Sequence, residues 1–271
     1  MFRKLCIAVA VLASFASISN AQDRSILVQS TTSTQNSGFY DYILPIFTDE
    51  TGITVNIVAV GTGQAIKNAE NGDADVLLVH AKEAEEAFVA SGNGVERFDL
   101  MYNDFVILGP EDDPLDLKGA DSVAKMLRIL STGDGIFVSR GDDSGTHKKE
   151  LSLWGSMGFT PEISSGWYRE TGSGMGSTIR VAVEMQAYTM SDRATWIAYE
   201  NKVDEVIVFE GEPPLFNQYG IIMVNPDKHP HVNVADAQIF IDWMLSDHGQ
   251  DLINSYYVNG QQLFFANAAP I

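Results

Sequence analysis

Short apolar runs alternate with segments of helical periodicity along most of this 271-residue chain. The run Ile26–Val28 is followed by apolar residues at helical spacing from Phe39 to Phe47, and strand-like patterns return over 53–60 and 75–79. This order is typical of parallel sheets whose two faces are covered by helices. We therefore expect an α/β fold with mainly parallel sheets and helices on both faces, in which loops at the carboxyl ends of strands bind the ligand.

The middle of the chain contains a possible boundary between two parts of the fold. The apolar run Val106–Leu108 ends in Gly109-Pro110 and an acidic turn, and the strand-like segment Gly220–Val224 comes much later. Two such crossings predict two lobes joined by paired strands. We place the first lobe at residues 22–108 and 216–271, and the second lobe at residues 109–215.

The N-terminus has the features of a secretory signal. Arg3 and Lys4 precede an apolar run from Leu5 to Ile18, and a small-x-small cleavage site ends at Ala21. The run is shorter than the roughly 20 residues that cross a bilayer, so we expect a cleaved signal over residues 1–21 and no membrane insertion. Cys6, the one cysteine, lies within it, so the mature chain has no disulfide. The mature protein is expected in the periplasm.

Acidic side chains outnumber basic ones, 36 against 17, and the formal net charge is −19 at pH 7. Such a surface repels nucleic acid and anionic membranes, so neither is an expected partner. An anion can bind such a protein only where donors and positive charge are strongly local. The histidines show no metal-ligand spacing, so we expect neither a metal nor another cofactor.

A run of hydroxyl side chains, Ser30-Thr31-Thr32-Ser33-Thr34, follows the first strand. Hydroxyls and the free N–H groups at a helix start are donors suited to an anion. A helix N-cap uses the same residue types but needs only one, so five in a row favour a ligand role for this loop. Gly61-Thr62-Gly63 repeats the device after the second strand, because glycines let the backbone approach an anion closely and Thr62 can donate or cap.

A strand-like segment ends at Arg140, the one basic residue in these donor-rich loops. Its guanidinium offers directed donors that match oxyanion edges, and Ser144 and Thr146 add hydroxyls at a helix start. Asp142 or Asp143 could instead hold Arg140 in an ion pair that braces the turn, with Ser144 as the helix cap. Both can hold together, because a carboxylate can orient the guanidinium while its far edge stays free. We favour ligand contact by Arg140.

Two weaker features complete the survey. The Gly-rich stretch from Gly172 to Thr178 suits a third donor-rich helix entry and a plain flexible loop equally well. Asp192 and Arg193 are expected to cap and brace the helix that follows them.

Six segments, in the same order over nearly the whole mature chain, resemble the tungstate-binding proteins of bacterial ABC importers. They are residues 30–35, 60–65, 72–80, 101–107, 139–147 and 187–193. The resemblance implies the two-lobed type II periplasmic-binding-protein fold, with tungstate held between the lobes and delivered to the membrane permease of an importer. It points to Thr31, Arg140 and Thr146 as oxyanion contacts. The donor argument adds Thr32, Ser33, Thr62 and Ser144.

Phosphate capture is the nearest alternative, because Arg140 with Ser144-Gly145-Thr146 also resembles phosphate-binding relatives. Tungstate near neutral pH carries no proton, so its site should present donors only, whereas phosphate keeps a proton that Asp142 or Asp143 could accept. Molybdate has nearly the size and charge of tungstate and stays a second ligand. A secreted phosphate-ester hydrolase is the alternative from another class. Because Ser144 lies outside a Gly-x-Ser-x-Gly elbow, we expect no enzyme.

Overall fold

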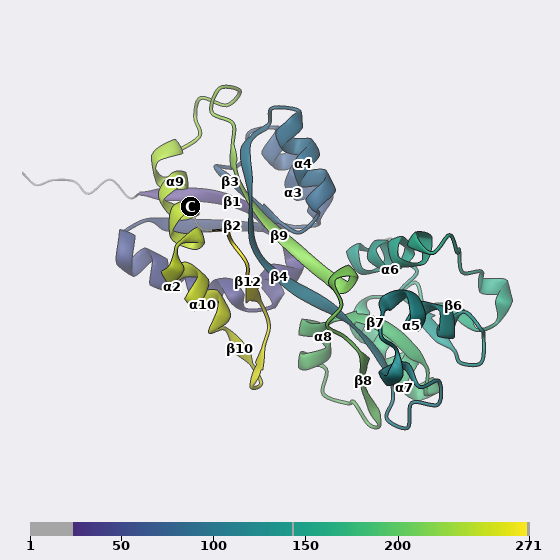
Figure 1. Ribbon diagram of the computed structural model, residues 1–271. Coiled ribbons are helices and arrows are strands. Elements are labelled where there is room, and N and C mark those ends of the chain that lie inside the picture. Colours follow the sequence, from purple (N-terminus) through teal and green to yellow (C-terminus); the bar gives the residue numbers. More distant parts are fainter. Residues whose placement is uncertain (1–23, 143, 270–271) are drawn as a thin grey trace, which may run out of the picture.

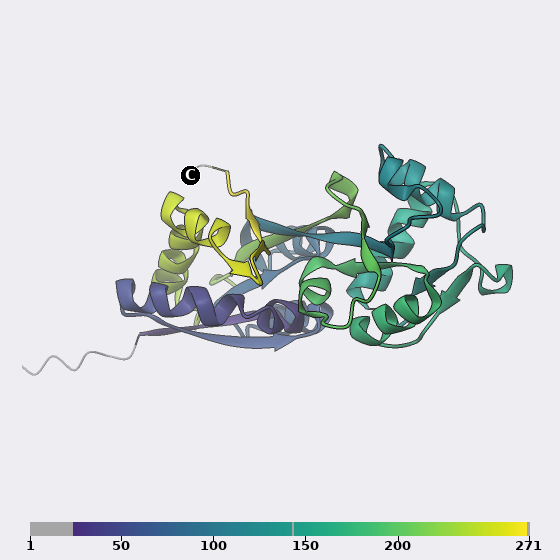
Figure 2. The ribbon, with the colours of Figure 1, turned by 90° about the horizontal axis from the view of Figure 1, so that it is seen from below.

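The computed structural model describes residues 24–142 and 144–269. The expected signal, residues 1–21, lies outside them. The described chain forms two bodies, each a sheet flanked by helices, joined along two long strands (Figures 1 and 2). The predicted α/β fold with helices on both faces is thereby confirmed. Within the described ranges, no helix combines the length and apolarity that a membrane span requires.

The first lobe is built on three parallel strands in the order β2-β1-β3: β1 (Ser25–Thr31), β2 (Thr54–Val60) and β3 (Val76–Val79). The helices that follow these strands are α1 (Thr32–Asn36), α2 (Phe39–Thr51), α3 (Thr62–Glu70) and α4 (Lys82–Ala90). The end of the chain returns to this lobe as α9 (Val234–Leu245), α10 (Asp247–Asn254), β10 (Tyr257–Val258), β11 (Gln261–Gln262) and β12 (Phe265–Ala266).

The second lobe carries the strands β5 (Phe137–Ser139), β6 (Tyr168–Glu170), β7 (Tyr188–Asp192) and β8 (Glu205–Phe209). Its helices are α5 (Val123–Leu130), α6 (Gly145–Ser156), α7 (Met175–Met185) and α8 (Arg193–Ala198), with single 3-10 turns at Leu117–Gly119, Ile163–Ser165 and Pro213–Leu215. β5 pairs in parallel with both β6 and β7.

Two antiparallel strands, β4 (Gly94–Pro110) and β9 (Phe216–Val224), run side by side between the lobes (Figure 1). β4 pairs with β9 as far as Asp104, and from Phe105 it pairs with β7 and β8 instead. One continuous strand therefore belongs to the sheets of both lobes. The lobe division at residues 108 and 216 stays a prediction.

The strand directions place the loops of interest. β4 runs from the first lobe to the second, and β9 is antiparallel to it. Because β3 is antiparallel to β9, the parallel strands β1, β2 and β3 all point toward the second lobe. Because β7 is antiparallel to β4, the parallel strands β5, β6 and β7 all point toward the first lobe. The carboxyl ends of both parallel sets are thus directed at the boundary between the lobes.

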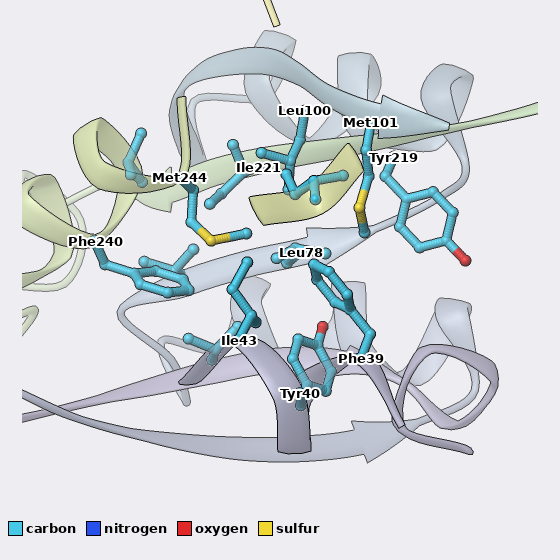
Figure 3. Packing of buried hydrophobic residues seen from close by; sticks show 14 of the residues in the cluster. Phe39, Tyr40, Ile43, Leu78, Leu100, Met101, Tyr219, Ile221, Phe240 and Met244 are labelled. Carbon is cyan, nitrogen blue, oxygen red and sulfur yellow. The ribbon is translucent and has the colours of Figure 1, made fainter. Parts of the chain in front are cut away.

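Each lobe has its own hydrophobic core, so its loops are held on a rigid base. In the first lobe, Phe39 and Ile43 of α2 pack with Phe240 and Met244 of α9 on one face of the sheet (Figure 3). The other face is covered by α3 and α4 through small side chains and Phe88. The largest cluster of the second lobe surrounds the aromatic residues Phe137, Trp154, Tyr168 and Tyr188.

Candidate functional site

The hydroxyl run lies at the carboxyl end of β1 and enters α1. Thr31 is the N-cap of α1, and its Oγ1 accepts from the N–H of Thr34 at 3.4 Å. The same atom lies 2.8 Å from Oγ1 of Thr34 and 3.1 Å from Oγ of Ser33, and Thr31 is only 2% exposed. Thr32 and Ser33 are exposed. The capping role and the donor-rich loop therefore coexist, and Thr32 and Ser33 are the members open to a ligand.

The loops after β2 and β3 lie beside this run. Thr31 is in register with Val60 of β2, and Thr62 begins α3 two residues later. The N-cap of α3 is Gly61, which supplies no side-chain acceptor, so the first N–H groups of α3 have no side-chain cap. His80 follows β3, and its Nε2 lies 3.2 Å from Oγ1 of Thr31 and 3.1 Å from Oγ of Ser33.

Arg140 follows β5 in the second lobe, and its turn is built much as the sequence predicts. Nη2 of Arg140 donates to Asp142 at 2.5 Å, and Asp142 also accepts from the N–H of Ser144 at 3.2 Å. Ser144 is the N-cap of α6, where it accepts from the N–H of His147. Both the ion pair and the cap expected from the sequence are confirmed, and Asp143 lies outside the described residues.

The Arg140 guanidinium has one N–H that the described residues of this turn do not use, on the edge that Nη2 shares with Nε. Its Nε is buried and has no hydrogen-bond partner among the residues that the structure describes. Thr146, in the first turn of α6, is buried at the same helix start. Because a buried N–H without an acceptor is costly, this atom calls for a partner that the described part of the chain does not provide.

A buried carboxylate supports the strand end on which Arg140 sits. Glu150 of α6 accepts hydrogen bonds from Ser139 at 2.5 Å, from Tyr168 at 2.8 Å and from Trp154 at 3.1 Å. Burial raises the pKa of Glu150, against the lowering effect of these donors. The network ties β5, β6 and α6 together, so the position of Arg140 relative to the α6 start is fixed by the core.

Further polar residues of the second lobe gather at the same sheet edge, beyond those that the sequence singled out. Thr171 follows β6, donates to the carbonyl of Arg140 at 3.3 Å, and lies 2.8 Å from Oγ1 of Thr178. Gly174 is the N-cap of α7 and supplies no side-chain acceptor. The stretch from Gly172 to Thr178 is therefore a helix entry, one of the two possibilities that the sequence left open. The one signal that could have identified Thr171 as a site residue is its position directly after the strand that ends at Glu170.

Lys149 is a cation that the sequence did not distinguish from a solvated helix face. It lies on α6, and its Nζ donates to the carbonyl of Phe216, the first residue of β9, at 3.3 Å. Burial lowers the pKa of Lys149. The side chain thus links a second-lobe helix to a strand that runs between the lobes.

The arrangement brings the seven predicted residues into two groups. Thr31, Thr32, Ser33 and Thr62 lie at strand ends of the first lobe, and Arg140, Ser144 and Thr146 lie at the facing edge of the second. Within residues 24–142 and 144–269, no hydrogen bond joins the two groups, and no cluster of three or more His, Cys, Asp or Glu side chains could hold a metal ion. The donors, two uncapped helix starts and one guanidinium suit a small anion.

Known proteins share this architecture and much of this sequence. The tungstate-binding protein TupA of Peptoclostridium acidaminophilum is 50% identical over 249 residues, which cover 90% of this chain and 86% of that protein. The structure of the tungstate-binding protein TupA from Desulfovibrio alaskensis G20 matches with a TM-score of 0.88 and 46% identity, over 91% of this chain and 100% of that one. The tungstate ABC transporter structure from Geobacter sulfurreducens matches with a TM-score of 0.73 and 48% identity, over 86% of this chain and 98% of that one.

The PBP superfamily domain matches residues 17–248, which include the second lobe, most of the first lobe and all seven candidate residues. This match agrees with the relatives, which are close to half identical to the chain over most of their length. The chain belongs to the PBP superfamily and, within it, to the family of the tungstate-binding proteins TupA.

Proposed function

We propose that this protein captures tungstate between its two lobes and delivers it to the membrane permease of an ABC importer. The ligand class is supported by the relatives, which are named for tungstate binding and for a tungstate ABC transporter. Molybdate, which has nearly the same size and charge, binds at the same place with comparable or lower affinity. The protein acts in the periplasm after removal of residues 1–21, and it is a binder and not an enzyme.

The observation that carries this proposal is the unsatisfied Nε of Arg140. Its Nη2 is occupied by Asp142, so the guanidinium is oriented while its buried Nε–H has no acceptor among the residues that the structure describes. An oxyanion held against the start of α6 supplies that acceptor and meets Thr146 and the Ser144 loop at the same time. In the facing lobe, Thr32, Ser33, Thr62 and the uncapped start of α3 complete a shell of donors.

The state of Asp142 favours an unprotonated dianion over hydrogen phosphate. Burial raises the pKa of this carboxyl, but hydrogen bonds from Ser144 and Arg140 outweigh that effect and hold it below its usual range. Asp142 is therefore an anion whose oxygens are engaged within the turn. It holds Arg140 in place and is poorly available as the acceptor that the proton of phosphate needs. A donor-only shell matches tungstate.

Binding in this way requires the lobes to close on the ligand. The two groups of donors share no hydrogen bond among the described residues, while each rests on its own core. A dianion that accepts from both groups stabilises the closed form relative to the open one. Small-angle scattering with and without saturating tungstate should show a smaller radius of gyration for the bound protein, and identical curves would place the ligand on one lobe alone.

Titration calorimetry with tungstate, molybdate, sulfate and phosphate, each at equal concentration and pH, tests the ligand. We expect tight binding of tungstate, comparable or weaker binding of molybdate, and little heat from sulfate, a smaller tetrahedron that cannot reach all donors. A ligand at 1,000 times its Kd stabilises the folded state by about 4 kcal/mol, so the melting temperature should rise by several degrees. Preference for phosphate would overturn the proposal, and turnover of phosphate esters would refute the absence of catalysis.

A further inference from the structure

His80 occupies the carboxyl end of β3, beside the hydroxyl run of the first lobe. Its Nε2 is within hydrogen-bond distance of two hydroxyl oxygens, 3.2 Å from Oγ1 of Thr31 and 3.1 Å from Oγ of Ser33. The ring packs against Tyr219 of β9, with 4.8 Å between the ring centroids. His80 therefore contacts the hydroxyl run through one buried member, Thr31, and one exposed member, Ser33.

The imidazole is neutral at physiological pH. Burial lowers the pKa of His80 to about 4, against smaller raising effects from its own backbone and from a hydrogen bond with the Asn217 side chain. Asn217 in turn donates to Asn103 at 2.9 Å, and Asn103 donates to the hydroxyl of Tyr219 at 3.3 Å. The groups around the ring are thus neutral amides and hydroxyls. A neutral ring carries a single N–H, so Nε2 is either a donor or an acceptor.

The two tautomers have opposite consequences for the ligand. If Nε2 carries no hydrogen, it accepts one from Thr31 or Ser33, and that hydroxyl can no longer donate to an anion. If Nε2 carries the hydrogen, it donates to a hydroxyl oxygen and leaves the hydrogen of that hydroxyl free to point elsewhere. Oγ1 of Thr31 also accepts from the N–H of Thr34, and its own hydrogen can be donated to Oγ1 of Thr34 or to Oγ of Ser33. A donor-only site requires the second tautomer.

We propose that His80 is a positioning residue that presents Nε2–H to the hydroxyl oxygens of Thr31 and Ser33, so that the hydrogen of the exposed Ser33 hydroxyl is directed at a proton-free oxyanion. This inference rests on the proposed function, because it assumes a ligand that only accepts hydrogen bonds. The contacts of Asn217 with His80 and Asn103 also anchor the ring to β4 and β9, the strands that run between the lobes. The hydroxyl run is therefore oriented from the same strands that link the two halves of the site.

Two substitutions of His80 separate the contribution of its N–H donor to binding from the contribution of the shape of its ring. His80→Phe keeps an aromatic ring against Tyr219 but cannot donate, and we expect it to weaken tungstate binding about 10-fold, the scale of one hydrogen bond. His80→Gln keeps an N–H donor and should bind within about 3-fold of the wild type. His248→Phe is the matched control, because His248 is exposed on α10 and bonds only Glu50 among the described side chains. Melting temperatures of the unliganded variants verify that each is folded.

Nitrogen NMR of the unliganded protein at pH 7 tests the tautomer directly, and the spectrum of His80→Gln assigns the His80 signals. We expect the Nε2–H form, with no imidazolium above pH 6. A bare Nε2, or tungstate binding by His80→Phe as tight as by the wild type, would overturn the inference and leave the proposed function standing. If wild-type protein binds none of the four oxyanions, both fail together.

Discussion

Arg193 and Asp104 form a two-point ion pair where β4 changes its strand partners. Nε and Nη2 of Arg193 donate to the two carboxylate oxygens of Asp104 at 2.6 and 2.5 Å. Asp104 is the last residue of β4 in register with β9, and Phe105 is the first in register with β7. The side chains are 14% and 5% exposed. The hydrogen bond with Asp104 is the main cause of a raised pKa for Arg193, so the pair holds its charge at the boundary between the lobes.

Removing one member of this pair should be costly. Asp104→Asn leaves a buried guanidinium that lacks its main partner, and we expect a loss of about 3–5 kcal/mol in the free energy of unfolding. Glu210→Gln is the matched control, because Glu210 also bonds Arg193 but is 49% exposed, and it should cost about 1 kcal/mol or less. Urea denaturation of both variants measures the difference. If both variants lose the same free energy of unfolding, the burial of Asp104 does not determine how strongly its ion pair stabilises the protein.

Arg140→Ala should weaken tungstate binding by about 2–4 kcal/mol, as expected for the loss of a charge-assisted contact with a desolvated anion. Arg140→Lys should recover only part of this, because an ammonium group cannot reproduce the fork of a guanidinium. Arg180→Ala, on the exposed surface of α7, removes the same charge away from the site and should leave affinity nearly unchanged. Titration calorimetry compares the three, and a normal Kd in a folded Arg140→Ala variant would remove Arg140 from the site.

Glu205 of β8 should give the protein a stability component that falls as pH rises. Burial raises the pKa of this carboxyl to about 7, and its Oε1 has no partner among the described residues. Between pH 4.5, the ordinary value, and pH 7 the folded state holds the proton more tightly than the unfolded state does. Stability from Glu205 is therefore fully present at low pH and is lost as pH rises through 7.

The Glu205→Gln variant isolates this effect, because the amide mimics the protonated acid at every pH. At pH 5 the variant and the wild type should melt at similar temperatures, and at pH 8 the variant should melt several degrees higher. Glu200→Gln, at an exposed position, should show no such divergence. If the melting temperatures of wild type and Glu205→Gln change in parallel across this pH range, ionisation of Glu205 does not destabilise the folded state.

Gly141 lets the chain turn between Arg140 and Asp142. Its φ is +60°, and an added Cβ would lie 2.5 Å from Cβ of Glu170. Gly141→Ala should therefore cost about 1–2 kcal/mol in backbone strain, more if Glu170 cannot move, and should weaken tungstate binding because it displaces Arg140. Gly155→Ala, inside α6 with open space around it, should be neutral or stabilising by up to about 1 kcal/mol. Thermal unfolding and calorimetry of both variants check the contrast.

The parts of the fold that could be predicted are those with a local signal. The strands that end at Thr31, Val60 and Val79, and the helices after them, follow from apolar periodicity within a few residues. β4 could not be predicted at its full length, because residues such as Glu96, Arg97 and Asp99 interrupt its apolar pattern. Its pairing with β9 joins segments more than a hundred residues apart, and a single sequence carries no local mark of such a partner.

The candidate site divides in the same way. The ion pair of Arg140 with Asp142 and the cap by Ser144 could be predicted, because they act over two or three residues. The contact of His80 with Thr31 spans 49 residues and depends on strand order, so the histidine stood out only as the last residue of a motif. Ligand contact by the seven predicted residues stays a prediction that the binding experiments decide.

The path of the chain through β4 and β9 also determines the order in which the two lobes can fold during synthesis. The second lobe is drawn from one continuous stretch between these strands, whereas the first needs α9, α10 and β12 from the end of the chain to complete its core. A polypeptide that emerges N-terminus first can therefore assemble the second lobe while the first still exposes the apolar faces of α2 and β1. That intermediate exposes more apolar surface than the finished protein, so it is the species more prone to aggregate.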